Sequence, residues 1–385
     1  MRSVAVCGSK VKELLPENRT IKAIELKGAP VSFGLINVSP PPFDPDDPNQ
    51  SQSVLIKVKA FSCNFRDLGV IFGALRHGGD RSFYAVGSEF VAEVVATGAA
   101  VTDLRAGDRV IGNNCYLGEG ESCDGAAGGL PTNQASKEYQ VLHRTKVCKV
   151  PDAMPDTVAA AFSVGFQTVY SIIRKLSVEK DTNVLVTSAR SNTSLFAISA
   201  LRTRKARIYA TTSSVQFDEA LREMGVEELI QIDLNAEEGL GRGNAFEKLQ
   251  RVSNRIGGFD YVIDPFFDLH LPLALNFMKP GAKYATCGLA ATAEELVGRR
   301  FTLPMPNLTE VLSRAMAMNY QLISSCLGST VDLQDALRDY NAGRVDVVVD
   351  SVYRGDEVAN FFQRTFAARE RFGKVIYEYV QAENN

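Results

Sequence analysis

The chain has 385 residues and a mass of 41.9 kDa, which at roughly 150 residues per domain predicts two domains rather than one compact core. Hydrophobic residues make up 45% and charged residues 23% of the chain, a balance that excludes a wholly disordered protein. The 42 Lys and Arg against 45 Asp and Glu give a net charge of −3, so the composition predicts no general attraction to nucleic acid or to an anionic membrane.

Seven cysteines are scattered along the chain without a CxxC pair, a pattern typical of reduced thiols rather than of a disulfide framework. The first residues contain no apolar segment long enough for export, and no later segment is long enough to span a bilayer. We therefore expect a cytoplasmic protein. The three histidines lie far apart and form no metal-binding motif, so no metal site is expected from them.

Short segments of alternating polarity, separated by Gly and Pro, dominate the first 150 residues and predict a β-rich domain. The predicted strands are Thr20–Leu26, Val31–Val38, Ser53–Ala60, Phe90–Ala96 and Asp108–Gly112. Pro40–Pro48 contains too few backbone donors for a sheet interior and is predicted to be a surface loop. A Gly-rich acidic stretch, Gly118–Gly129, is predicted to be a mobile excursion.

Beyond Pro151, apolar strands alternate with helical segments. The expected order is helix Val158–Leu176, strand Asn183–Thr187, helix Ser194–Arg204, strand Arg207–Thr211, helix Gln216–Met224, and strands Leu229–Ile232, Phe259–Ile263 and Lys283–Cys287. This alternation indicates a parallel sheet, because parallel strands need helical crossovers. The last expected elements are helix Leu333–Tyr340, strand Val345–Val349, helix Val358–Thr365 and strand Lys374–Tyr379.

The segment from Asn183 to Ala197 passes directly from a strand into a helix, which is where a dinucleotide-binding fold places the pyrophosphate. The three positions of a G-x-G-x-x-G fingerprint are occupied by Ala189, Ser191 and Ser194, so all three glycines are missing. Small side chains still allow a phosphate to approach, and the polar residues add donors to the helix N-terminus. They are Ser191, Asn192, Thr193 and Ser194. The alternative is an ordinary helix with a polar N-cap.

About twenty residues further on, where NAD-binding chains place a carboxylate on the ribose, the sequence reads Thr211-Thr212-Ser213-Ser214. No carboxylate follows until Asp218. Hydroxyl groups tolerate a 2′-phosphate that a carboxylate would repel, so NADPH is the expected cofactor, with Arg190 or Arg207 as the positive partner. The alternative is a set of ordinary polar residues at a strand end.

Several motifs in this order resemble the medium-chain dehydrogenase/reductase superfamily. They are Cys63-Asn-Phe-Arg-Asp-Leu68, Val86-Gly-Ser-Glu-Phe-Val91, Ala106-Gly-Asp-Arg-Val110, Thr168-Val-Tyr170, the turn at 183–197 and Arg371-Phe-Gly-Lys-Val-Ile376. The resemblance runs from about Thr20 to Tyr379, and the first two motifs are similar to zinc-independent quinone oxidoreductases and polyketide-type enoyl reductases. It implies an α/β fold in which a GroES-like β-rich catalytic domain (1–160 and 328–385) accompanies a doubly wound Rossmann domain (161–327).

The resemblance also bears on zinc. Zinc alcohol dehydrogenases of this superfamily carry Cys where this chain has Asn64, His where it has Ser88, and a further Cys near Val164. Amide, hydroxyl and alkyl side chains do not rebuild such a site, so we expect no catalytic metal. Only Cys115 and Cys123 fall in the region of the structural zinc lobe.

The resemblance implies further roles. Asn64 would lie beside the nicotinamide and the substrate carbonyl, although a turn-forming amide is an equal alternative. Thr168 and the strand end Cys287-Gly288-Leu289 would line the nicotinamide pocket, and Lys374 would close over the substrate or cap the last strand. Tyr84 is the expected proton donor, with His77 as its rival because the pKa of a histidine lies nearer neutrality.

The resulting hypothesis is an NADPH-dependent, zinc-independent reductase. It would transfer a hydride to the activated C=C of an enoyl or quinone-like acceptor that is either a small molecule or thioester-linked. The alternative is a chain that keeps the fold but has lost dinucleotide binding, and serves as a non-redox enzyme or an accessory binding protein. The resemblance further implies a homodimer joined through the edge strand Tyr320–Ser324.

Overall fold

The chain forms two compact units, described by a computed structural model that covers residues 1–114, 128–232, 244–291 and 306–380. The first unit contains residues 1–164 and 348–385, and the second contains the intervening chain apart from residues 296–298. Helix α11 (Thr330–Asn341) therefore belongs to the second unit, whereas the sequence analysis placed the chain from residue 328 onward with the first. Most of the acidic excursion expected at 118–129 lies outside the described residues.

The first unit is built on two mainly antiparallel sheets. One has the order β2-β3-β1-β5, and the other has the order β16-β17-β4-β6-β7-β9 with β8 pairing to β4. The strands are β1 (Arg2–Cys7), β2 (Lys22–Leu26), β3 (Ala29–Asn37), β4 (Ser53–Ser62), β5 (Phe83–Ala85), β6 (Glu89–Thr97), β7 (Arg109–Gly112), β8 (Tyr139–His143), β9 (Val147–Lys149), β16 (Val349–Arg354) and β17 (Lys374–Glu378).

Strand β1 was not expected from the sequence, yet it lies in the middle of its sheet. It pairs antiparallel with β3 and with β5, and Val4, Ala5 and Val6 are almost fully buried. Its five consecutive buried residues show no alternation of polarity, and this is why a pattern search passes over it. The chain before Thr20 is thus part of the core of the first unit.

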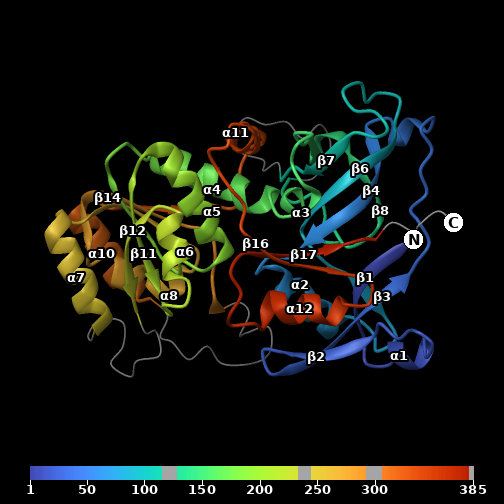
Figure 1. The fold of residues 1–385 in the computed structure, drawn as a ribbon, viewed down its shortest axis with the longest axis horizontal. Helices are drawn as coiled ribbons and strands as arrows, with labels where there is room; N and C mark the ends of the chain where they lie inside the picture. The colour runs from blue at the N-terminus through green and yellow to red at the C-terminus, as the bar shows by residue number, and fades with distance from the viewer. Residues whose placement is uncertain (115–127, 233–243, 292–305, 381–385) are drawn as a thin grey trace. The chain divides into compact units, whose positions relative to one another are not determined.

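Four helices accompany these sheets: α1 (Val11–Leu14), α2 (Asp67–His77), α3 (Asp156–Ala159) and α12 (Val358–Phe366). Helix α12 contacts β2, β3 and β17, and Figure 1 shows it beside them. Phe362 stacks on Phe33 with ring centres 3.8 Å apart, and Phe361 packs edge-on against Phe61. Aromatic rings of this size bury large apolar areas, so they anchor the C-terminal segment in this unit.

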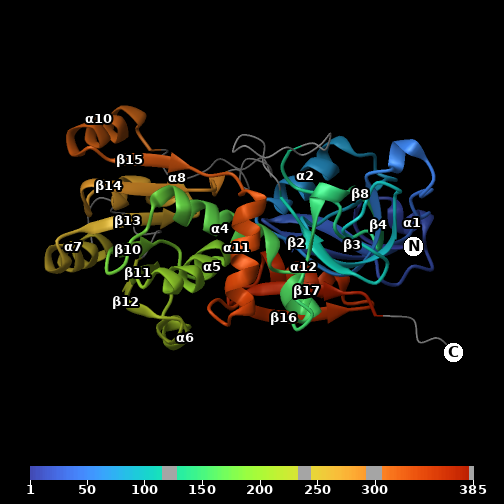
Figure 2. The same ribbon diagram turned by 90° about the horizontal axis from the view of Figure 1, so that it is seen from above.

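The second unit is a six-stranded parallel sheet with the order β12-β11-β10-β13-β14-β15, as Figure 2 shows from above. Its strands are β10 (Asn183–Val186), β11 (Arg207–Thr212), β12 (Val226–Gln231), β13 (Phe259–Asp264), β14 (Met278–Thr286) and β15 (Gln321–Ser324). The order reverses between β10 and β13, which makes the sheet doubly wound. The predicted α/β class is confirmed.

Helices cover both faces of this sheet. They are α4 (Ser163–Leu176), α5 (Asn192–Leu201), α6 (Asp218–Glu223), α7 (Asn244–Ile256), α8 (Phe267–Ala274), α10 (Leu308–Met318) and α11. Figure 1 shows α7 and α10 on one side of the sheet and α4 and α5 on the other. Apolar residues of α7, α8 and α10 form one core with the strands, including Leu249, Leu271 and Val311.

Several expected elements differ in their extent: the strand predicted at Lys283–Cys287, for example, begins at Met278 and ends at Thr286. The single helix predicted over 158–176 is divided into α3 and α4, because the chain makes a turn at Ala160–Phe162. The strand predicted at Val345–Val349 begins instead at Val349 and runs to Arg354, where it pairs with β17. The apolar pattern continues through the turn between α3 and α4, so the pattern alone does not reveal that boundary.

Candidate functional site

A buried ionic network in the first unit contains two of the residues singled out from the sequence, Asn64 and Lys374. The central strand β4 carries Ser62 at its end, and the strand pairings set Ser62 opposite Glu89 of β6 and opposite Ile376 of β17. Asn64 follows β4 directly and Lys374 begins β17. The sheet register thus gathers side chains that are more than 300 residues apart in sequence.

Lys374 is the centre of this network. Its side chain is only 2% exposed, and its ammonium group contacts the Glu89 carboxylate, which is fully buried. The ammonium also donates to Asn64 Oδ1 at 2.9 Å and to the carbonyl oxygen of Cys63 at 3.3 Å. The second oxygen of Glu89 accepts from the backbone N–H of Val164 at 2.9 Å. A buried ion pair with these additional hydrogen bonds holds both charges in fixed positions.

Asn64 is held rigidly by the same network. Its Nδ2 atom donates to Ser88 Oγ at 3.0 Å and to Glu89 Oε1 at 3.2 Å, while its Oδ1 atom accepts from Lys374. Both amide hydrogens are therefore used inside the network, and one lone pair of Oδ1 remains for a ligand. Lys374 is expected to close over the substrate or to cap the last strand. It is the first residue of β17, and its buried ammonium group holds the amide of Asn64 in place.

A second buried carboxylate completes the arrangement. Asp67, at the start of α2, accepts from Ser88 Oγ at 2.6 Å and from the backbone N–H of Asn64 at 2.7 Å. Arg66 donates to its other oxygen at 3.0 Å. Burial raises the pKa of Asp67 above its usual value, although these hydrogen bonds and charges act in the opposite direction.

The donor set of this network does not fit a zinc ion. Zinc sites in proteins are built from thiolate, imidazole and carboxylate ligands. Of the three expected ligand positions, Asn64 offers an amide, Ser88 a hydroxyl and Val164 an alkyl side chain, and the nearby Glu89 carboxylate is already neutralised by the Lys374 ammonium. Burial raises the pKa of the neighbouring Cys63 thiol well above its usual value, which keeps it protonated. Within the described residues no group of His, Cys, Asp and Glu side chains is arranged to hold a metal.

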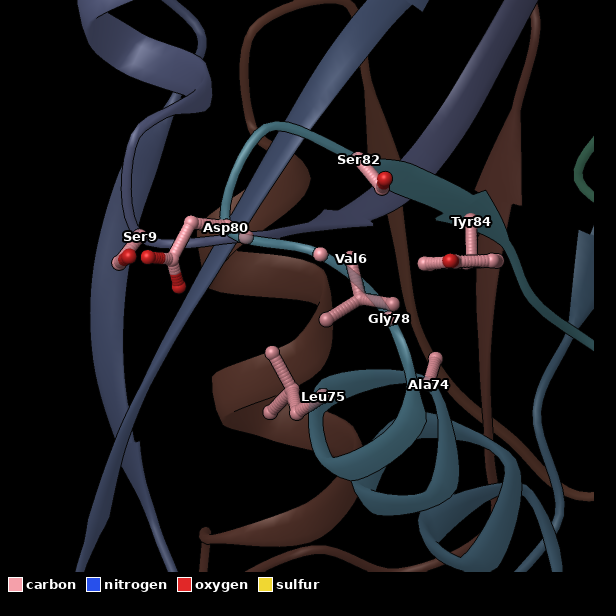
Figure 3. Close-up of a pocket in the computed structure, with 10 residues that line it drawn as sticks. Val6, Ser9, Ala74, Leu75, Gly78, Asp80, Ser82 and Tyr84 are labelled. Atoms are coloured by element: carbon pink, nitrogen blue, oxygen red, sulfur yellow. The ribbon is translucent and has the colours of Figure 1, made fainter.

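Tyr84 lies elsewhere in the same unit. It lines a small pocket of about 140 Å³ at the C-terminal end of α2, shown in Figure 3, together with Val6, Ala74, Leu75 and Gly78. A Cβ atom on Gly78 would lie 2.5 Å from the Tyr84 ring, so a glycine is needed for this close approach.

The length of α2 therefore separates Tyr84 from Asn64. Asn64 precedes the first turn of the helix, and the 11 residues of α2 span roughly 16 Å. His77, the rival candidate acid, is the last residue of α2 and lies at the same end as Tyr84. The structure thus brings neither candidate acid to Asn64.

In the second unit, the turn between β10 and α5 contains the residues expected to meet a pyrophosphate. Ser191 is the N-cap of α5: its Oγ accepts from the N–H of Ser194 at 3.1 Å and donates to Ser194 Oγ at 2.9 Å. Ser194 Oγ in turn donates to the carbonyl oxygen of Thr187 at 2.7 Å. Both hydroxyl hydrogens are used within the turn, so a phosphate at this position would be met by the N–H groups of the first helical turn.

The turn brings further expected residues together. Ala189 is fully buried, and its N–H donates to the carbonyl oxygen of Thr211 at 2.8 Å, while Asn192 and Thr193 open α5. Thr193 also interacts with the thiol of Cys287 after β14, where burial raises the thiol pKa to about 12. Gly288 follows, and a Cβ atom there would lie 2.3 Å from the carbonyl oxygen of Pro265. Leu289 is the next residue, and Thr168 lies on α4 with its side chain buried.

The end of β11 carries the residues expected to meet a ribose phosphate. Thr212 Oγ1 donates to the carbonyl oxygen of Ser214 at 2.8 Å, and Ser213 is exposed. The guanidinium of Arg190 lies 5.1 Å from the centre of the Phe217 ring, three residues beyond Ser214. This contact holds a positive charge beside the segment that follows β11.

Arg207, the alternative positive partner, begins β11 instead. The strand has six residues, so Arg207 and Thr212 are roughly 16 Å apart. Arg207 donates to the carbonyl oxygen of Asp181 at 2.8 Å. Of the two arginines, only Arg190 therefore lies near the end of β11 that carries Thr212.

Two residues at this turn, Ser188 of the turn itself and His270 of α8, were not predicted to be site residues. Ser188 precedes Ala189 and has a positive φ of 48°, and its Oγ lies 2.8 Å from Nε2 of His270 on α8. His270 is 2% exposed. Their separation along the chain hides this pair, because only the pairing of β10 with β13 brings the following segments together.

Comparison with known proteins agrees with this fold. The alcohol dehydrogenase GroES-like domain model matches residues 50–152. An L-threonine 3-dehydrogenase of Chelativorans sp. is 28% identical over 266 residues, which cover 64% of this chain and 72% of that protein. A mycocerosic acid synthase-like polyketide synthase of Mycolicibacterium smegmatis is 29% identical over 247 residues, which are 64% of this chain but only 10% of that much longer protein.

Solved structures share the fold at lower identity. A 2-octenoyl-CoA carboxylase reductase in complex with NADP and 2-octenoyl-CoA has a TM-score of 0.73 at 18% identity, covering 100% of this chain and 88% of that one. An NAD-dependent alcohol dehydrogenase has a TM-score of 0.73 at 21% identity, covering 98% and 99%. The expected pairing of a GroES-like domain with a Rossmann domain is confirmed. The family match and the shared fold together support the assignment of this chain to the medium-chain dehydrogenase/reductase superfamily of oxidoreductases.

Proposed function

We propose that the chain is an NADPH-dependent reductase that works without zinc and reduces a C=C bond conjugated to a carbonyl group, as in an enoyl thioester or a quinone. The observation that carries this proposal is the buried Lys374–Glu89–Asn64 network. Asn64 of this network and its hydrogen-bond partner Ser88 stand at two positions where the resemblance implies zinc ligands, and an amide and a hydroxyl do not rebuild such a site. Alcohol oxidation by this superfamily's zinc enzymes depends on a Lewis acid, whereas an activated alkene accepts a hydride without one.

The turn at 188–194 and the end of β11 fit a phosphorylated dinucleotide. The N-terminus of α5 supplies backbone donors for the pyrophosphate, and Arg190 with Ser213 and Ser214 would hold a 2′-phosphate. When bound, NADPH supplies the hydride. Asn64 offers the remaining lone pair of its amide oxygen to the ligand, held in place by Lys374. Since Tyr84 and His77 lie at the far end of α2, water is the proposed source of the proton.

Two relatives support the substrate class. One is a reductase whose solved structure contains NADP and an enoyl thioester, and the other is a polyketide synthase. NADP and the enoyl thioester belong to the first of these proteins, and polyketide synthesis belongs to the second. The acceptor that we propose for this chain is of the same chemical class.

Calorimetric titration with NADPH and with NADH tests the cofactor. We expect NADPH to bind more tightly, and Arg190→Ala to weaken NADPH binding about tenfold while leaving NADH binding unchanged. Arg207→Ala is the matched control, because this arginine lies at the other end of β11. Equal loss for NADH and NADPH in Arg190→Ala would contradict the assigned role. Loss of NADPH absorbance with an enone, a quinone and an enoyl thioester then identifies the acceptor.

One observation favours the second function, a fold-retaining protein without a dinucleotide. The hydroxyl hydrogens of Ser191 and Ser194 are both used inside the turn. If neither NADPH nor NADH binds in the titration, the function without a dinucleotide replaces the reductase as the proposed function.

A further inference from the structure

Ser188 has an unusual backbone conformation for a serine. Its φ of 48° lies in the left-handed region, which is strained for a residue other than glycine. Three hydrogen bonds hold it there: its N–H donates to Thr211 Oγ1 at 3.1 Å, the N–H of Ala189 donates to the carbonyl oxygen of Thr211, and the N–H of Ser191 donates to the carbonyl oxygen of Ser188. A strained serine in a sharp turn from a strand into a helix is typical of an exposed nucleophile.

A histidine is positioned against this serine. His270 Nε2 lies 2.8 Å from Ser188 Oγ, within hydrogen-bond distance. Its other ring nitrogen, Nδ1, is buried and has no hydrogen-bond partner within the described residues. Two carboxylates, Asp264 and Asp268, lie close enough to influence the imidazole, but their oxygens are taken. Thr187, Tyr284 and the N–H of Phe266 bond to Asp264, while the N–H groups of Ala290 and Ala291 bond to Asp268.

The protonation state of His270 suits a general base. Burial lowers the pKa of the imidazole below its usual value, although Asp264 and Asp268 act in the opposite direction. The ring is therefore neutral at pH 7, and in the tautomer that carries its proton on Nδ1 the Nε2 lone pair can accept the hydroxyl proton of Ser188. A base within hydrogen-bond reach converts a weakly nucleophilic serine into a reactive one.

The start of α5 provides the third component of the site. Ser188 precedes the ten-residue helix by four positions, and the N-cap of that helix is Ser191, whose Oγ accepts from the N–H of Ser194. The positive end of the helix dipole stabilises the negative charge that develops on a carbonyl oxygen during attack. The nucleophile, the base and the anion-stabilising group thus come from one turn and one neighbouring helix.

We propose that Ser188 and His270 form a nucleophile–base pair that hydrolyses esters of short carboxylic acids, an activity separate from the proposed reduction. Ser188 Oγ attacks the carbonyl carbon while its proton passes to His270 Nε2. The ester C–O bond breaks, and the alcohol leaves with that proton. Water then attacks the acylated serine, gives a proton to His270, and releases the acid as the serine regains its proton. Ser188 is half-buried, which favours small acyl groups.

Two probes test the pair in the full chain without a nucleotide: a fluorophosphonate that labels active serines, and p-nitrophenyl acetate. We expect labelling at Ser188, located by mass spectrometry, and slow release of p-nitrophenolate. Ser188→Gly should abolish both, and it should fold well because glycine accepts the positive φ without strain. Ser177→Gly is the matched control and should retain full labelling, because Ser177 is an exposed serine of the same unit with a positive φ of 56°.

The role of His270 has its own readout. His270→Gln should slow acylation about a hundredfold or more, within the range typical of a general base. The rate of the natural chain should fall as pH drops through the pKa of His270, which lies below 6.5. Labelling at another residue, no labelling, or equal rates in His270→Gln would each overturn the proposal. Because no nucleotide is present, none of these outcomes bears on the proposed reductase.

Discussion

At the scale of single residues, Lys374 is the most constrained charge in the first unit. Its ammonium group and the Glu89 carboxylate are both buried and have each other as counter-ion. Removal of one partner from such a pair leaves an uncompensated buried charge, which costs about 3–5 kcal/mol. If both charged residues are replaced together, no unpaired charge is left in the interior, and this cost does not arise.

We therefore expect Lys374→Met to lower the free energy of unfolding by about 3–5 kcal/mol, and Glu89→Gln to recover part of this loss when combined with it. Denaturant unfolding measures both variants. Lys149→Met is the control, because Lys149 is half exposed and its 2.8 Å pair with Asp108 should contribute about 1 kcal/mol or less. A loss in Lys374→Met no larger than in the control would show that Glu89 does not need this cation.

At the scale of elements, α11 shows how one carboxylate fixes the start of a helix. Asp332 is 2% exposed and forms a capping box with Ser329, the N-cap of α11. It also accepts two hydrogen bonds of 3.0 Å from Arg174 of α4. Burial by itself would raise the pKa of Asp332, but the bonds from Arg174 and Ser329 outweigh it and lower the pKa below its usual value.

A lowered pKa means that Asp332 stabilises the fold above the pKa that it has in the unfolded chain, and that this contribution is lost as pH falls through the lower pKa of the folded state. Asp332→Asn should therefore destabilise the protein by about 2 kcal/mol at neutral pH, and by less at about pH 3. Urea unfolding at both pH values checks this. Asp335→Asn, on the surface of the same helix, should change little at either pH. A pH-independent loss in Asp332→Asn would contradict an electrostatic role.

In the strand-to-helix turn of the second unit, hydrogen bonds decide which serine hydroxyl groups are available to a ligand. The sequence pattern predicts that the hydroxyl groups of Ser191 and Ser194 bind a ligand. In the structure both hydroxyls donate hydrogen bonds within the turn. The same turn presents Ser188 to His270 instead. Its polar residues are thus divided between capping the helix and facing a neighbouring helix, and sequence spacing alone does not distinguish the two.

At the scale of the whole molecule, the expected homodimer is still a proposal, and one face of the second unit supports it. Strand β15 ends the six-stranded order, so one of its edges has no described strand beside it. Leu308, Leu312 and Met316 of the adjoining α10 are 68%, 48% and 79% exposed at a spacing of four residues. An apolar stripe beside an open strand edge suits a second copy related by a two-fold axis.

Sedimentation velocity tests this surface. We expect the natural chain to sediment as a dimer and the double variant Leu312→Glu/Met316→Glu as a monomer, because each new carboxylate would be buried against its symmetry mate. Val331→Glu is the control, since Val331 is a 56% exposed apolar residue on α11 and should leave the dimer intact. A natural chain that is monomeric at all concentrations would remove the proposal.

The described residues contain no helix long and apolar enough to cross a membrane.

The sequence by itself determined the α/β class, most elements and the location of the strand-to-helix turn within residues 183–197, because these follow from local periodicity and from short motifs. The alternation of strands and helices after Pro151 required a parallel sheet, and the loss of all three glycines was visible at once. Strand β1 was missed because a fully buried strand has no alternating pattern. The break between α3 and α4 was missed because the apolar run continues through it.

Only the tertiary structure decided which side chains meet. Strand register brings Lys374 to Glu89 and Asn64, and so makes a lysine expected to close over the substrate or to cap the last strand the counter-ion of a buried carboxylate. The length of α2 keeps Tyr84 from Asn64, and the direction of β11 selects Arg190 over Arg207. The pairing of β10 with β13 sets His270 against Ser188. Contacts between residues distant in sequence depend on register and on element length, which no local pattern encodes.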